Sequence, residues 1–386
     1  MAIAVATCWT EDIMMAPTPP MGWNSWNTFG PDIDEDVIRT TADAMVASGL
    51  KDAGYRYVCI DDLWEADERV DGKLTWDAAR FPNGMPALAD YIHGLGLKFG
   101  IYSCSGTHTC AGKPASFGYE EADAQTFADW GVDFLKYDHC YFPPGADPRA
   151  AYARMGQALR MTGRPILYSL CNWGGNEVWT WGASVGGHMW RTGGDINDSW
   201  DSIVHLGFRR QKDLQPWGRP NGWNDPDMLV VGMRNRGHVA REGCSDDEYR
   251  SHFSLWCLQA APLMIGCDVR DMDQATKDIL LNRELIAVNQ DPLGIQAACL
   301  GGHRRCEVWV KPLAGGDLVV GFFSLHEKLQ GNVPIAWEQL HLHDRRVCRL
   351  TDLWSGEDLG THSRIFNSGP LAPHACQVVR ISPQRD

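Results

Sequence analysis

A lysine and an aspartate two residues apart, Lys136 and Asp138, are the residues of this chain best suited to carry chemistry. They follow an apolar run, Val132, Phe134 and Leu135, that is typical of a buried parallel strand, and such strands carry chemistry at their carboxyl ends. Side chains two apart on a strand share a face, so the cation is expected to hold the Asp138 carboxylate ionised, as a nucleophile requires. A structural Lys–Asp ion pair is the alternative, and the pair alone does not exclude it.

Further polar residues follow nearly every expected strand. They are Trp26, Asp61, Asp62, Tyr102, Cys171, Trp173, Arg191, Asp195, Asp225 and Asp227. Carboxylates and tryptophans suit sugar recognition, because carboxylates accept hydrogen bonds from hydroxyls and indole faces pack against sugar rings. Each residue also has a structural interpretation, such as a helix cap for Asp61 or a core position for Trp26. Their recurrence at one strand end after another favours a site.

The elements that must position these residues alternate between short strands and amphipathic helices from about residue 20 to 295. Strands are expected at 55–60, 99–103, 134–137, 166–170, 188–191 and 263–267, and helices over 36–49, from 86 to 94 or 96, and over 121–130. This alternation predicts a parallel sheet, and about eight units fit the ~250 residues of a (β/α)8 TIM barrel. An open doubly wound sheet is the rival, but no GxGxxG follows a strand.

After residues 289–294 the pattern changes to short runs rich in valine and aromatic residues, separated by GG, DR and SG turns, with no convincing helix. The runs lie at 307–311, 317–323, 347–353 and 377–381. They predict a small antiparallel β-sandwich that packs on the barrel. The predicted division of the α/β chain is therefore an N-terminal extension (1–16), a catalytic barrel (17–296) and a C-terminal antiparallel β-sandwich (297–386).

Composition narrows the class of partner. The 386 residues are 44% hydrophobic and 22% charged, which is ordinary for a globular protein. The net charge of −14, with scattered lysines and arginines, argues against nucleic acid or a membrane as partner and favours a neutral small molecule. Neither a membrane-spanning stretch nor a basic leader is recognisable, which predicts a cytoplasmic protein. Thirteen cysteines, an odd number without CxxC, predict mostly free thiols and no zinc site.

Several long motifs together resemble the melibiase-type α-galactosidases. They are PPMGWNSW, CIDDLW, GIYS, CAGKPASFGYEEADAQTFADWGVDFLKYDHC, YSLCNWG, WRTGGDINDSW, GWNDPDMLVVG, AAPLMIGCD and VNQDPLG, and they cover most of residues 17–295 in order. The resemblance implies a retaining glycoside hydrolase with a (β/α)8 barrel followed by an antiparallel β domain. It would release terminal α-linked galactose from oligosaccharides or glycoconjugates without metal or organic cofactor. The partner implied is a small-molecule α-galactoside, and a homo-oligomer stays open.

By this resemblance Asp138 is the nucleophile and Asp195 the general acid and base. The paired Asp61 and Asp62 would hold the axial 4-hydroxyl and the 6-hydroxyl. The other substrate-binding candidates are Lys136 for ring hydroxyls, Arg191 and Asp227 for the 2-hydroxyl side, Trp26 as an apolar wall, Tyr102 to orient Asp138, Cys110, and Cys171 with Trp173 near the 2-position. The mechanism asks Lys136 to lower the pKa of Asp138 and needs a raised pKa on Asp195.

The chain departs from the family pattern at Leu63, and it has Asn172 where animal members commonly have a glutamate; some alternatives stay open. Leu63 stands where the family usually has a cysteine joined to an earlier one, so that disulfide is absent. The resemblance implies a disulfide between Cys110 and Cys140, although a reducing cytosol would leave two thiols. Three other enzyme specificities of the same family are alternatives to α-galactosidase, namely α-N-acetylgalactosaminidase, β-L-arabinopyranosidase and α-glucan hydrolase. A sugar-binding protein without catalysis is a further alternative. Cys171 and Trp173 look too bulky for an N-acetyl pocket.

Overall fold

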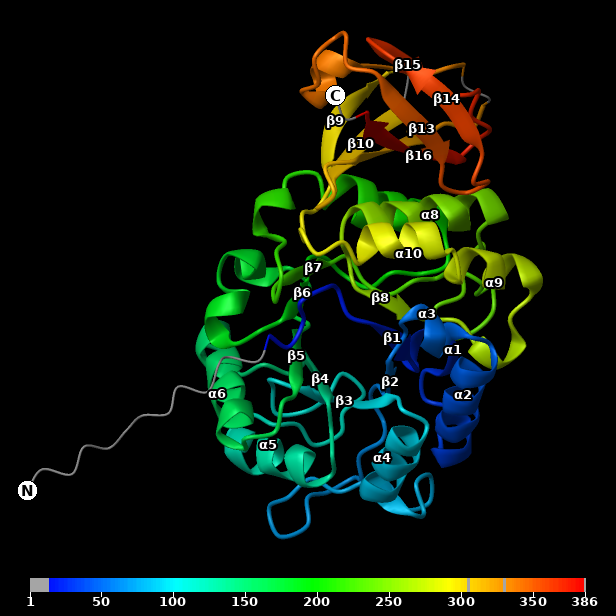
Figure 1. Cartoon of the computed structure of the whole chain (residues 1–386). Helices are drawn as coiled ribbons and strands as arrows, with labels where there is room; N and C mark the ends of the chain where they lie inside the picture. Colours follow the sequence, from blue (N-terminus) through cyan, green and yellow to red (C-terminus); the bar gives the residue numbers. More distant parts are fainter. Residues whose placement is uncertain (1–13, 304–305, 329–330, 385–386) are drawn as a thin grey trace, which may run out of the picture.

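The computed structural model describes residues 14–303, 306–328 and 331–384. Eight strands form one parallel sheet in the order β7-β6-β5-β4-β3-β2-β1-β8. They are β1 (Met21–Asn24), β2 (Tyr57–Cys59), β3 (Lys98–Cys104), β4 (Phe134–Asp138), β5 (Leu167–Leu170), β6 (Met189–Arg191), β7 (Trp223–Asp225) and β8 (Leu263–Ile265). Leu229, just after β7, pairs in parallel with Ile265 of β8, so the two edges of the sheet meet. The predicted (β/α)8 barrel is confirmed (Figure 1).

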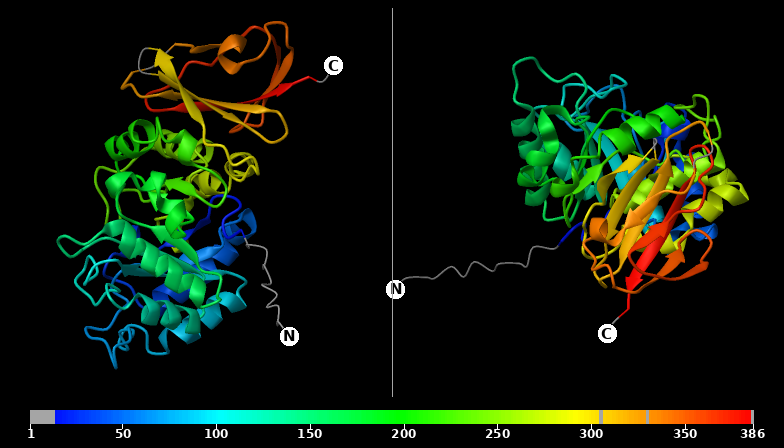
Figure 2. Two further views of the ribbon diagram at one scale, coloured as in Figure 1. Left: turned by 90° about the vertical axis from the view of Figure 1, so that its left-hand side faces the viewer. Right: turned by 90° about the horizontal axis from the view of Figure 1, so that it is seen from above.

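Helices cover the outside of the barrel in both further views (Figure 2). They are α1 (Trp26–Phe29), α2 (Glu35–Ala47), α3 (Leu50–Ala53), α4 (Gly84–Gly94), α5 (Glu120–Asp129), α6 (Pro148–Met161), α7 (Trp200–Ile203), α8 (Asp246–Leu258), α9 (Gln274–Leu280) and α10 (Arg283–Asn289). Two short 3₁₀ segments, Gly175–Thr180 and Gly182–Val185, replace the helix that would follow β5. After β6, α7 continues into a π-helical segment over Val204–Arg209.

Local signals in the sequence set the helix boundaries. The Asp34 side chain accepts a hydrogen bond from the Val37 amide at the start of α2, and Gly49 follows the end of that helix with φ of 86°. Ser245 and Glu248 form a capping box at the start of α8, because each side chain satisfies a free amide of the first turn. These helices therefore begin and end close to the residues that the sequence indicates.

Because helices cover the sheet, the barrel strands are buried along almost their whole length. One cluster of buried apolar side chains draws on six of the eight strands, as expected for residues that fill the interior of a barrel. Its strand members are Tyr57, Cys59, Phe134, Leu167, Met189, Trp223 and Met264. A larger cluster joins the outer side chains of the strands to the helices. The filled interior leaves the carboxyl ends of the strands as the place where a cavity can open.

The C-terminal region forms a separate antiparallel sheet in the order β14-β13-β16-β11-β10-β9, with β12 and β15 paired beside it. The strands are β9 (Ala298–His303), β10 (Cys306–Pro312), β11 (Leu318–Ser324), β12 (Pro334–Ala336), β13 (Cys348–Asp352), β14 (Asp358–His362), β15 (Ile365–Asn367) and β16 (Cys376–Pro383). The predicted antiparallel domain is confirmed, although Trp337–Leu340 forms a 3₁₀ turn that the sequence pattern did not indicate. The domain boundaries stay predictions, and most of the predicted extension, residues 1–13, lies outside the described residues.

The C-terminal sheet packs directly on α8 (Figure 1). The Ser251 hydroxyl of α8 donates a hydrogen bond to the His374 carbonyl at 2.6 Å, and the Trp354 indole donates one to the Ser254 hydroxyl at 3.0 Å. Gly321 of β11 lies so close to this helix that an added Cβ would come within 2.6 Å of Leu258. The two domains therefore share a close-packed interface.

A buried lysine at this interface predicts a pH-dependent gain of stability on its removal. Lys311 of β10 is fully buried, and its amine has no hydrogen-bond partner within the part of the chain that the structure describes. Burial lowers its pKa from 10.5 to about 8, which corresponds to about 3 kcal/mol against folding when the amine is charged in both states. That cost is fully present below pH 8 and fades as the pH rises toward 10.5, because the folded state loses its proton first.

We therefore expect Lys311→Met to raise the melting temperature at pH 7 and to raise it less at pH 10. Thermal unfolding of both proteins at the two pH values measures the difference in melting temperature between them. Because the two proteins are compared at the same pH, the titration of all other groups cancels. Lys212→Met serves as the control, since that lysine is partly exposed and bonded to Glu307. An equal or larger gain at pH 10 would contradict the explanation.

Candidate active site

A cavity of about 190 Å³ opens where the barrel strands end. Its lining residues are Trp26, Asn27, Asp61, Asp62, Tyr102, Cys110, Lys136, Asp138, Cys140, Trp173, Arg191, Asp195, Asp227 and Met228. The structure thus brings together the site residues expected from the sequence except Cys171 and Asp225, which line a smaller adjoining space. The roles of these residues stay predictions.

Asp138 ends β4 and is buried, with both carboxylate oxygens held. The Tyr102 hydroxyl donates a hydrogen bond to Oδ2 at 3.3 Å, and the amide of His139 donates one to Oδ1 at 2.9 Å. Burial raises the pKa of Asp138 to about 6, although the charge of Lys136 lowers it. Lys136 therefore acts in the expected direction, but desolvation outweighs the cation and the net shift of the pKa is upward.

Lys136 forms its ion pair with Asp61 and not with Asp138. Its amine lies 2.7 Å from Asp61 Oδ2, which also accepts a hydrogen bond from the Asn24 amide at 2.8 Å. Asp61 Oδ1 accepts the backbone amide of Asp62 at 3.0 Å. Both Lys136 and Asp61 line the cavity. The pair therefore ties the end of β4 to the end of β2 across the intervening β3.

Asp62 holds two loops together with its two carboxylate oxygens. Oδ1 accepts the amide of Leu63 at 2.8 Å, in the loop after β2. Oδ2 accepts the amide of Ala111 at 2.8 Å, in the loop after β3. Burial raises the pKa of Asp62, while these hydrogen bonds oppose the rise. A carboxylate fixed at both oxygens presents its remaining lone pairs in a set direction.

On the opposite side, Arg191 at the end of β6 lies between two aspartates. Its guanidinium is 3.0 Å from Asp195 Oδ1 and 3.0 Å from Asp227 Oδ2. The Asp195 side chain is 68% exposed, and the charges of Arg191 and Lys136 outweigh its partial desolvation, so the pKa of Asp195 is lowered. The raised pKa that a general acid needs is therefore not found at Asp195. Burial raises the pKa of Asp227, which stays close to the same arginine.

Asp227 reaches the cavity through a left-handed backbone conformation, with φ of 92°. Its own amide donates a hydrogen bond to Asp225 Oδ1 at 2.9 Å, and its Oδ2 accepts the Ile196 amide at 2.7 Å. The indole of Trp256 in α8 donates to its carbonyl at 2.8 Å. A non-glycine residue rarely adopts this conformation without such support, so the surrounding contacts fix Asp227 at the cavity wall.

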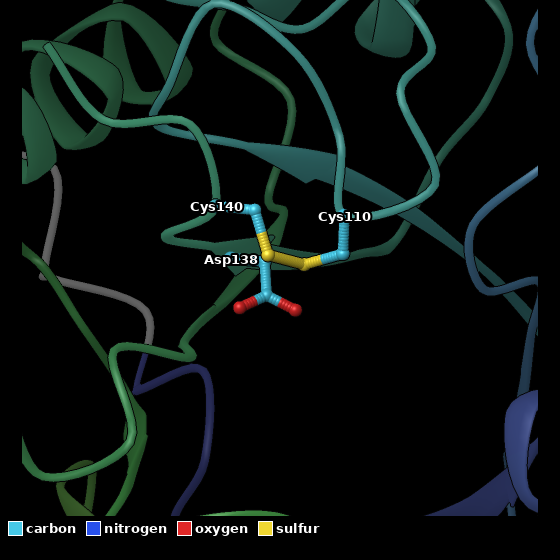
Figure 3. A group of neighbouring side chains, drawn as sticks. All are labelled: Cys110, Asp138 and Cys140. Atoms are coloured by element: carbon cyan, nitrogen blue, oxygen red, sulfur yellow. A yellow bond between two sulfur atoms is a disulfide. The ribbon is translucent and has the colours of Figure 1, made fainter.

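A disulfide between Cys110 and Cys140 lies beside the Asp138 carboxylate (Figure 3). It joins the loop after β3 to the second residue past the end of β4, with the two Cα atoms 5.0 Å apart. The Tyr102 hydroxyl, which donates to Asp138, also lies 3.3 Å from the Cys110 sulfur. The structure therefore has the pairing that the resemblance implied. It places this cross-link in the wall of the cavity.

Two tryptophans contribute apolar surface to the cavity. Trp26 begins α1 and packs edge-on against His238, with ring centroids 4.9 Å apart. Trp173 is 37% exposed, with a left-handed φ of 56°, so its indole is available at the mouth of the cavity. An indole face beside carboxylates is the arrangement that binds the apolar side of a sugar ring.

Cys171 does not line the main cavity but a smaller space of about 30 Å³. Lys136, Arg191, Asp227 and Met228 line both spaces, and the Cys171 sulfur lies 3.7 Å from the Arg191 guanidinium. Its predicted place near the 2-position of the sugar stays a prediction. Sequence reasoning missed two lining residues, Asn27 and Met228, although each is adjacent in sequence to a predicted one.

Among the described residues, one group of three side chains has the spacing of metal ligands, namely Cys110, Asp138 and Cys140. Its two sulfur atoms are bonded to each other, so the group offers one carboxylate and no thiolate (Figure 3). Such a set does not match the ligand requirements of a zinc site. The chemistry that the cavity itself offers is that of fixed carboxylates beside two cations.

Comparison with known proteins identifies the family. The model of alpha galactosidase A matches residues 18–291, and that of the alpha galactosidase C-terminal beta sandwich domain matches residues 303–381. An α-galactosidase of Cyamopsis tetragonoloba is 43% identical over 374 residues, covering 96% of this chain and 87% of the relative.

Two crystal structures extend the match over the whole architecture. The α-galactosidase I from Mortierella vinacea is 35% identical, with a TM-score of 0.89 over 95% of this chain and 97% of its own. The α-galactosidase from Saccharomyces cerevisiae with raffinose is 29% identical, with a TM-score of 0.87 over 95% of this chain and 98% of its own. The chain therefore belongs to the alpha galactosidase A family, the melibiases.

Proposed function

We propose that this chain is a retaining α-galactosidase that releases terminal α-linked galactose from small galactosides. The observation that carries the proposal is the cavity at the strand ends, in which Asp138 and Asp195 lie among fixed carboxylates and two indoles. Membership of the α-galactosidase family supports the reaction, and the relative crystallised with raffinose supports an oligosaccharide as substrate.

In the proposed mechanism Asp138 attacks the anomeric carbon and the glycosidic bond breaks, while Asp195 donates its proton to the leaving oxygen. The product is a galactosyl ester of Asp138. Asp195, now ionised, accepts a proton from water, which attacks the same carbon and releases Asp138. The Tyr102 hydroxyl and the His139 amide hold the nucleophile in place throughout, because both bonds are to its carboxylate.

The protein groups by themselves favour the opposite protonation from the one that this mechanism uses. The pKa of Asp138 is raised to about 6, and that of Asp195 is lowered by Arg191. A neutral sugar in the cavity excludes water from the Asp195 carboxylate. This desolvation disfavours the charged form and raises the pKa of Asp195. The rate depends on the fraction of enzyme molecules in which Asp138 is ionised and Asp195 is protonated. The pH dependence of this fraction is the same bell-shaped curve whichever of the two groups has the higher pKa.

Other partners and the compartment stay predictions. No helix in the described part of the chain is long and apolar enough to cross a membrane. The net charge of −14 supports a neutral ligand in place of nucleic acid or an anionic membrane. We keep a cytoplasmic location and an optional homo-oligomer as proposals, which cell fractionation and light scattering of the purified protein would test.

The purified protein should hydrolyse p-nitrophenyl α-galactoside with release of α-galactose as first product, and it should leave the α-glucoside almost untouched. The physical reason is that a site built to bind an axial 4-hydroxyl leaves buried acceptors unpaired with the equatorial epimer. Proton NMR of early product measures the stereochemistry. Release of β-galactose would refute retention, and equal hydrolysis of the two glycosides would refute the galactose assignment.

Asp138→Asn should abolish turnover on every substrate, because the variant cannot form the covalent ester. Asp195→Asn should reduce kcat by about 10²- to 10⁴-fold on raffinose but much less on a dinitrophenyl galactoside, whose leaving group needs no proton. Azide should rescue Asp138→Gly with inverted product. Circular dichroism checks folding of each variant, and near-normal turnover by Asp138→Asn would remove the nucleophile assignment.

The pH dependence of kcat/KM should be a bell, with an alkaline limb near pH 6 and an acid limb below the usual carboxyl value of 3.8. In Asp195→Asn with the dinitrophenyl substrate, only the requirement for ionised Asp138 remains. The rate should then fall as the pH drops below the pKa of Asp138, at or under about 6, since the charge of Asp195 no longer raises it. An alkaline limb that persists in the variant contradicts the pairing of these two groups.

A further inference from the structure

A buried acid that no part of the proposed mechanism uses lies directly behind Asp62. Glu65 follows in the loop after β2 and is fully buried, although it does not line the cavity. Its Oε2 accepts the Leu63 amide at 3.1 Å, the same amide that donates to Asp62 Oδ1 at 2.8 Å. One N–H group therefore serves two carboxyl groups, one in the cavity wall and one behind it.

The backbone at this point is strained in a way that needs support. Leu63 has a left-handed φ of 78°, a conformation that is costly for a residue with a branched side chain. The conformation persists because its amide is held by Asp62 and Glu65 and its carbonyl accepts the Arg80 guanidinium at 3.4 Å. Removal of the Glu65 carboxyl group releases the Leu63 amide on one side, so that Asp62 alone then holds it.

The surroundings of Glu65 disfavour a negative charge on its carboxyl group. The side chains that act on it electrostatically are Asp62 and Asp61, both negative, and its Oε1 has no hydrogen-bond partner among the residues that the structure describes. Burial and the charge of Asp62 raise the pKa of Glu65 well above its usual value. A neutral carboxyl group can share one N–H with a carboxylate, whereas a second charge would repel Asp62.

We propose that Glu65 is a positioning residue for Asp62: through the shared Leu63 amide it fixes the direction in which Asp62 presents its lone pairs to a galactose hydroxyl. The inference rests on the proposed function, because it assigns Asp62 to sugar binding. Glu65 touches neither the sugar nor the reacting atoms. Its effect falls on substrate binding and not on the chemical step.

The test replaces Glu65 with residues that keep or remove the neutral acceptor. Glu65→Gln keeps an uncharged oxygen at the same reach, so KM for p-nitrophenyl α-galactoside should stay within about twofold of the unmodified value. Glu65→Leu removes the acceptor and Glu65→Asp withdraws it by one methylene. Both should raise KM about tenfold and change kcat by less than about threefold. If Glu65→Leu does not fold, Glu65→Asp carries the test.

A double-mutant cycle separates positioning from general destabilisation. With Asp62→Asn in the background, Glu65→Leu should lower kcat/KM no further, because the residue that it positions is already altered. Glu120→Leu is the matched control. Like Glu65, Glu120 is buried and accepts a hydrogen bond from a nearby backbone amide, that of Gly118, but it lies outside the cavity. Its KM should not change.

The outcomes distinguish this inference from the proposed function. Absence of α-galactoside turnover by the unmodified protein would refute the function. Turnover with unchanged KM in both Glu65→Leu and Glu65→Asp, or an equal additional loss in the Asp62→Asn background, would overturn the role of Glu65 alone.

Discussion

The constraint on which this structure depends is the concentration of negative charge at the carboxyl ends of the barrel strands. Five aspartates line one cavity of about 190 Å³, and its lining contains two cations, Lys136 and Arg191. Lys136 pairs with Asp61, and Arg191 lies between Asp227 and Asp195. Asp138 is left with hydrogen bonds and no direct ion pair, which is why burial raises its pKa. Backbone amides hold Asp62 and Asp227, and these bonds fix the loops around the cavity.

Much of the fold could be predicted because its signals are local. Strand alternation and helix caps indicated the barrel, and runs of valine and aromatic residues indicated the second sheet. The segment between β5 and β6 could not be predicted, because the left-handed Gly174 and Gly186 stand at its two ends and Trp181 separates its two 3₁₀ turns. Closure of the sheet through Leu229 was also invisible, since that pairing depends on where the loop after β7 returns.

The site shows the same division between what is local and what is not. Residue types after each strand identified Asp138, Asp195 and most of the cavity wall. The partner of Lys136 could not be predicted, because Asp61 is distant in sequence and competes with the nearby Asp138 only after folding. The net pKa shifts of Asp138 and Asp195 could not be predicted for the same reason. They depend on desolvation and on the charges that surround each group after folding, which no spacing reveals. Glu65 gave no signal, because a glutamate in a polar loop is ordinarily exposed.

Helix α8 has two neighbours, and this limits how the protein can change. Toward the barrel, its Trp256 donates a hydrogen bond to the carbonyl of Asp227, and its His252 accepts the amide of Val230. Toward the C-terminal sheet, Ser251 and Leu258 meet residues of that domain. Unlike the outer helices of an isolated barrel, it offers little solvent-facing surface on which substitutions would be neutral. Exchange of the C-terminal domain for that of a relative would therefore have to bring matching changes in α8, and through α8 it would reach the backbone that positions Asp227.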